Sequence, residues 1–170
     1  MRFLAVIGTL AIVVAVAAAV FFFGGYFNVA ATNPDPAVVD WALKQVRMAS
    51  VARYAGVTGA VSLDDPAVVQ AGARAFAERG SALCHGAPGA PYQKFAEGLQ
   101  PYPPDLMETG KAREPAQLFW VIKNGIKMTG MPNFTVTGAD DKEIWAIVAF
   151  VKKLPNVSEA DFKAWSAKAP

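Results

Sequence analysis

The only cysteine and the only histidine of the chain, Cys84 and His85, stand side by side in the stretch RGSALCHGAPG at 79–89. Metal centres built from protein ligands alone need several Cys, His or carboxylate groups, typically about four for structural zinc. Iron–sulfur clusters of the usual kind need about four thiolates. One cysteine and one histidine therefore exclude zinc fingers, such clusters and a haem iron held between two histidines of this chain.

A single histidine can still hold one axial position of a haem iron, and a methionine thioether can hold the other. Three methionines fall in predicted loops, namely Met107, Met128 and Met131. Met48 falls in a predicted helix far from those loops. A thiol directly before the histidine can add to a haem vinyl group, as in C-x-x-C-H attachment, of which S-A-L-C-H holds half. The alternative is that Cys84 is a small buried hydrophobic residue and His85 a hydrogen-bonded core residue.

The elements that must position these groups are predicted to be helices. Asp35 is the predicted N-cap of a helix over 36–56, and the same signal of Asp followed by Pro opens a second helix over 66–79. A third helix is predicted over 115–124. A fourth, DDKEIWAIVAFVKK, opens with Asp140 and Glu143 at capping-box spacing, and SEADFKAWS at 158–166 adds one or two further turns.

The segment from Ser81 to Leu106 shows no periodicity and is rich in Gly and Pro, so we expect it to lack regular structure. A loop of that length inside a compact domain needs something to organise it, and a haem would supply a large apolar surface. No segment after residue 23 shows sustained alternation of apolar and polar residues. The fold class is therefore predicted to be all-α.

Residues 3–23 carry no charge and are long enough, as a helix, to span a hydrocarbon core of about 30 Å. Arg2 before the run places the N-terminus in the cytoplasm and the remainder across the membrane. The alternative is a signal peptide cleaved near Val29, Ala30 and Ala31, but its apolar region would be unusually long. The chain is thus divided into an anchor or signal at 1–27, a linker and helix at 28–64 and a main domain at 65–170.

The net charge of the chain is only +2, and its basic residues form no run interleaved with aromatic residues. Nucleic acid is therefore not an expected partner.

Residues 66–155 resemble a class I c-type cytochrome, in particular a membrane-anchored one with a single haem. The motifs that carry the resemblance are LCHG at 83–86, PPDL at 103–106 and GIKMTGMP at 125–132, in that order. The resemblance implies an all-α cytochrome c fold around one haem, preceded here by the N-terminal helix and one extra helix. In that fold Gly72 and Phe76 of the first helix meet Ile147 and Phe150 of the last.

The resemblance also implies the roles of single residues. His85 is the proximal iron ligand and Cys84 the second haem-attachment cysteine. The carbonyl of Pro104 accepts the other ring N–H of the histidine, which fixes the imidazole, and Leu106 packs on the haem. Met131 is the expected distal ligand, with Met128 as the alternative.

Ser81 departs from the family pattern, because it stands where the first attachment cysteine belongs. A hydroxyl is a much poorer nucleophile than a thiol near neutral pH. We therefore expect one haem c, attached through Cys84 only or held by ligation and packing.

The expected function is haem-based electron transfer by a protein that is not an enzyme and takes no small-molecule substrate. Its partners are redox proteins, and Lys94, Lys123 and Lys127 either guide their docking or are inert. The expected location is the bacterial inner membrane with the main domain in the periplasm, or the periplasm alone after cleavage. Two alternatives stay open, a cytochrome subunit of a larger membrane-bound dehydrogenase or oxidase, and a degenerate or sensor member with weak or no haem attachment.

Overall fold

The computed structural model of the protein describes residues 2–56 and 61–167. The chain divides into two units, Met1–Asp35 and Pro36–Pro170. Residues 57–60 of the predicted segment 28–64 and residues 168–170 of the segment 65–170 lie outside the described part. The segment boundaries drawn from the sequence remain predictions.

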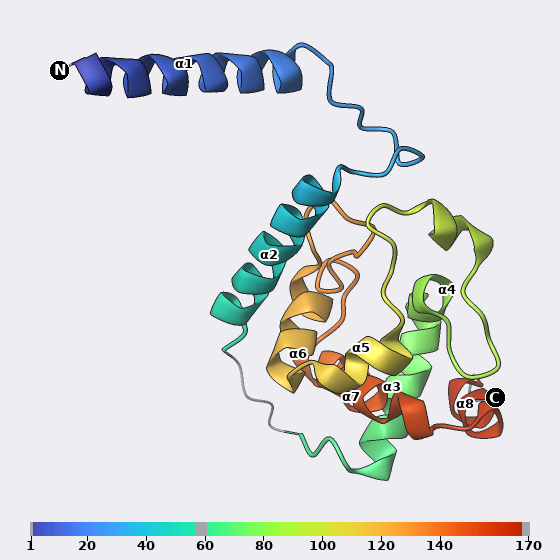
Figure 1. Cartoon of the computed structure of the whole chain (residues 1–170). Coiled ribbons are helices and arrows are strands. Elements are labelled where there is room, and N and C mark those ends of the chain that lie inside the picture. The colour runs from blue at the N-terminus through green and yellow to red at the C-terminus, as the bar shows by residue number, and fades with distance from the viewer. Residues whose placement is uncertain (1, 57–60, 168–170) are drawn as a thin grey trace. The chain divides into compact units, whose positions relative to one another are not determined.

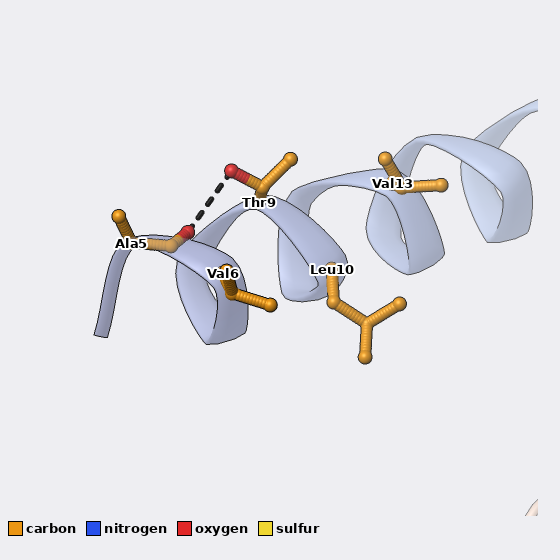
Figure 2. Close-up of a pocket in the computed structure, with 5 residues that line it drawn as sticks. All are labelled: Ala5, Val6, Thr9, Leu10 and Val13. Atoms are coloured by element: carbon orange, nitrogen blue, oxygen red, sulfur yellow. Dashed lines mark hydrogen bonds between the residues drawn. The ribbon is translucent and has the colours of Figure 1, made fainter. Parts of the chain in front are cut away.

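The first unit contains helix α1 (Arg2–Phe23), which is long and apolar enough to cross a membrane (Figure 1). Its described side chains are all exposed, and apolar residues occupy every face. The one hydroxyl on this helix, of Thr9, donates a hydrogen bond of 3.0 Å to the carbonyl oxygen of Ala5 (Figure 2). Because every backbone and side-chain polar group must be satisfied inside a bilayer, this internal bond suits a helix surrounded by lipid.

In the described part of the second unit, all regular secondary structure is helical, apart from one isolated bridge between Ala87 and Ala90. Its elements in chain order are α2 (Ala37–Tyr54), α3 (Pro66–Glu78), α4 (Ser81–His85), the 3₁₀ turn η1 (Lys94–Gly98), α5 (Leu106–Ala112), α6 (Pro115–Asn124), α7 (Asp141–Lys153), the 3₁₀ turn η2 (Leu154–Asn156) and α8 (Glu159–Ser166). These elements confirm the predicted all-α class, with the apolar helix and one extra helix before the main domain.

Helices α3 and α7 cross at the centre of the core (Figure 1). At the crossing Gly72 lies against the backbone of Ala146, and a side chain at this position would overlap the Ala146 carbonyl. The rings of Phe76 and Phe150 pack beside it with centroids 5.2 Å apart, and both side chains are fully buried. The small residue lets the two helices approach, and the aromatic pair fills the space on one side of the contact.

A second link joins the C-terminal end of α3 to the N-terminal end of α7. Arg79, which follows α3, donates its Nε and Nη2 hydrogens to the two carboxylate oxygens of Glu143 and its Nη1 hydrogens to Thr137. This fork raises the pKa of Arg79 above its ordinary value. Asp140 caps α7 through the Glu143 amide, but the Glu143 side chain binds Arg79, so only half of the predicted capping box forms.

Three sequence predictions about secondary structure are wrong. Met107 does not lie in a loop, because it belongs to the first turn of α5. Asp35 is not a cap, because α2 begins at Ala37 with Pro36 in the N-cap position. The segment from Ser81 to Leu106 is not without regular structure, since it holds α4 and η1. Five-residue turns are too short to produce visible periodicity, and the prolines that suggested a loop come only after the end of α4.

The crossing at Gly72 predicts a large loss of stability for Gly72→Ala. The added methyl group must displace the Ala146 backbone, so we expect the free energy of unfolding to fall by about 3 kcal/mol. Gly98→Ala is the matched control, because a Cβ at Gly98 meets no atom within 4 Å. Denaturant unfolding followed by circular dichroism measures both variants. Equal stability of the two would contradict the close crossing.

Candidate functional site: a haem cavity

Helix α4 presents Cys84 and His85 to a cavity inside the second unit. Gly80 precedes α4 as its N-cap with φ of 76°, and Gly86 follows α4 with φ of 71°, values that glycine adopts without strain. Both side chains are half-buried and line the cavity, as does Ser81. Ser81 and Cys84 are three positions apart on a helical turn and therefore share one face.

The His85 ring is held by one hydrogen bond to the backbone. Its Nδ1 lies 2.9 Å from the carbonyl oxygen of Pro104, the contact that the family resemblance implies. The Pro104 carbonyl precedes helix α5, whose N-cap is Asp105, so this oxygen lies outside the hydrogen bonds of the helix. A carbonyl only accepts hydrogen bonds, hence Nδ1 carries the proton and Nε2 has a free lone pair.

Burial lowers the pKa of His85 below its ordinary value, and the bond to Pro104 opposes this only in part. The imidazole is therefore neutral at neutral pH. A neutral imidazole whose second nitrogen is oriented by a backbone carbonyl is the form in which histidine binds metals.

The loop after α6 carries Met131 to the same cavity. Thr129 fixes this loop by donating to the Ile126 carbonyl at 2.8 Å and accepting from the Met131 amide at 3.1 Å. Met131 is half-buried, whereas Met128 is 95% exposed and does not line the cavity. Of the three methionines that the sequence analysis places in predicted loops, Met107, Met128 and Met131, only Met131 lies on the cavity wall.

All five residues expected around the iron line this one cavity, namely Cys84, His85, Pro104, Leu106 and Met131. The rest of the wall is mainly apolar and includes Phe76, Leu99, Leu118, Val121, Ile122, Ile126, Phe134, Ile147 and Val151. The donors are thus an imidazole nitrogen and a thioether, with a thiol beside the imidazole in an apolar enclosure. This set fits a haem. The described residues contain no group of three His, Cys, Asp or Glu that would fit a metal bound by protein alone.

Sequence reasoning missed the contribution of α2 to this cavity. Arg47, Met48 and Val51 lie on its wall, so the prediction that Met48 is far from the site is wrong. Helix α2 reaches the site by packing on α6, where the Tyr54 ring stacks on Trp120 with centroids 6.4 Å apart. The sequence did contain a signal for this contact, because Met48, Val51 and Tyr54 are spaced to lie on one face of a helix.

Of the three lysines considered for docking, Lys123 is engaged within the domain. Its ammonium group lies 2.6 Å from a carboxylate oxygen of Asp141 and 5.4 Å from the centroid of the Phe119 ring. Lys94 and Lys127 are exposed. A role of the three lysines in docking a redox partner remains a prediction.

The fold and the donor set define the class of the protein, a c-type cytochrome. Comparison with known families gives the particular family: the one described as cytochrome c oxidase, cbb3-type, subunit III matches residues 67–151, which is half of the chain. The chain belongs to this family. Its cytochrome c domain implies covalently bound haem c and a role in electron transfer. No curated protein and no solved structure matches the chain.

The Met131 loop predicts a specific sensitivity at Gly125. This glycine has φ of 67°, and a Cβ would lie 2.8 Å from the Asn133 nitrogen and 2.9 Å from the Met131 carbonyl oxygen. Gly125→Ala combines unfavourable backbone geometry with crowding, so we expect the free energy of unfolding to fall by about 3 kcal/mol.

Gly138→Ala separates these two effects. Gly138 has φ of 85°, but a Cβ there meets no atom within 4 Å, so only the backbone cost of about 1 kcal/mol applies. Denaturant unfolding measures both variants. If Gly125→Ala were no more destabilising than Gly138→Ala, the tight packing of the Met131 loop would be refuted.

Proposed function

We propose that the protein is a membrane-tethered electron carrier in which His85 and Met131 are the axial ligands of one haem c. Cys84 is its single covalent attachment point. The observation that carries this proposal is that these three side chains line one apolar cavity while His85 Nδ1 lies 2.9 Å from the Pro104 carbonyl oxygen. That contact leaves Nε2 for the iron.

A bound haem would supply the one-electron redox centre, and the chain would supply its surroundings. Pro104 holds the imidazole in one orientation and raises its basicity as a ligand. The Met131 thioether would serve as the second protein ligand, which would disfavour oxygen binding and raise the reduction potential. The apolar wall, including Leu106, excludes water. The proposal needs no general base, nucleophile or substrate, in line with a carrier that is not itself an enzyme.

Ser81 supports attachment through one bond. It shares a helical face and a cavity wall with Cys84, which is the arrangement that a first attachment cysteine would need. Its hydroxyl does not form the thioether that a thiol would form. Cys84 alone then tethers the cofactor.

Helix α1 supports the membrane tether. This helix has 22 residues including Arg2, carries no charge after Arg2, and is long enough to span the hydrocarbon core. The positive charge before it favours a cytoplasmic N-terminus, with the cytochrome domain in the periplasm. The alternative remains cleavage of this segment, which would release the domain into the periplasm.

A second candidate function is a cytochrome subunit of a larger membrane-bound oxidase. The family description refers to a subunit of such an oxidase. Helix α2 also exposes several large apolar side chains, at Val38, Trp41, Leu43 and Val46, which a neighbouring subunit would cover. Stable co-purification of oxidase chains after mild detergent extraction would favour this function over a free carrier.

The proposed ligand set is tested by Met131→Ala with Met128→Ala as the matched control. Loss of the thioether at position 131 removes the ligand that raises the potential, so the midpoint potential falls and the optical spectrum of the haem changes. Met128 is exposed and away from the cavity, so its replacement leaves both unchanged. An unchanged spectrum and potential in Met131→Ala would rule out this methionine as the ligand.

A further inference from the structure

Helix α2 precedes residues 67–151, the part of the chain that matches the cytochrome family, yet it forms part of the cavity wall. Val51 lies on that wall, is only 3% exposed, and is the one buried residue of α2. The Tyr54–Trp120 stack has an interplanar angle of 19° and fastens the same end of the helix to α6. The cavity face of α2 is thus docked, while most of its length is exposed.

The cavity wall carries three guanidinium groups and no carboxylate. Arg79 is fully engaged by Glu143 and Thr137. Arg47 and Arg113 are half-buried, and within residues 2–56 and 61–167 neither side chain forms an ion pair or a hydrogen bond. Half-buried cations on a cavity wall that carries no carboxylate are stabilised by an anionic ligand.

We propose that α2 is an added wall of the haem site and that Arg47 on it pairs with a carboxylate side chain of the haem. Arg113, between α5 and α6, is the second cation available to these carboxylates. The inference rests on the proposed function, because it needs a haem in this cavity. It gives α2 a role within the domain, in contrast to a helix that only links the domain to α1.

The pairing has an electrostatic consequence for the iron. A carboxylate near the haem stabilises the oxidised form, which carries one more positive charge than the reduced form. A guanidinium group that pairs with the carboxylate offsets this effect. Arg47 therefore raises the midpoint potential, and it acts as a positioning and charge-compensating residue that does not touch the iron.

The test is the midpoint potential of the full-length haem-bearing protein in detergent, measured by spectroelectrochemical titration. Arg47→Gln is expected to lower the potential. Arg53→Gln is the matched control, because it removes the same charge from the same helix at an exposed position that does not line the cavity. Arg47→Lys keeps the charge but not the planar fork, so its potential is expected to lie between those of the wild type and Arg47→Gln.

A shift in Arg47→Gln no larger than that in Arg53→Gln would overturn the inference. Equal shifts in the two variants would leave the proposed electron-transfer function intact, provided that the haem spectrum of Arg47→Gln is that of the wild type. A wild-type protein that carries no haem would instead refute the proposed function, and the inference with it. A merely structural role of Arg47 predicts that Lys and Gln at this position shift the potential equally.

Discussion

The close crossing of α3 and α7 at Gly72 is the constraint on which the rest of the domain depends. Because Gly72 has no side chain, α3 lies directly on the Ala146 backbone, and the Arg79–Glu143 pair holds the far end of the same contact. Only Arg79 and the left-handed Gly80 separate α3 from α4. The position of Cys84 and His85 is therefore set by the crossing, and the short helix itself needs little stability of its own.

Opposite α4, the site is completed by backbone groups and loops that this core supports. The Pro104 carbonyl orients His85 without any ionisable partner, and burial lowers the pKa of the ring, which therefore stays neutral. Gly125 and Thr129 shape the loop that brings Met131 to the cavity. Rigid donors of this kind suit electron transfer, because the surroundings of the redox centre then change little between oxidation states.

The sequence was sufficient to predict the long helices, because α3, α6 and α7 each bury an apolar face and begin at clear signals. It also identified the residues that meet at the cavity, since LCHG, PPDL and GIKMTGMP each combine a functional side chain with the Gly or Pro that positions it. It did not predict α4, whose single turn carries no periodicity. It misplaced Met48 and overlooked Arg47, because only the packing of α2 on α6 brings these residues to the cavity. Distance along the chain is a poor guide to such contacts.

The central claim is that one covalently attached haem occupies the cavity and is tethered by Cys84. The intact mass of the denatured protein from its native membrane, together with its pyridine haemochrome spectrum, tests this most directly. The expected result is the mass of the 18.0 kDa chain plus one haem, with the band position of a single thioether bond. A folded protein with the mass of the chain alone would contradict the claim.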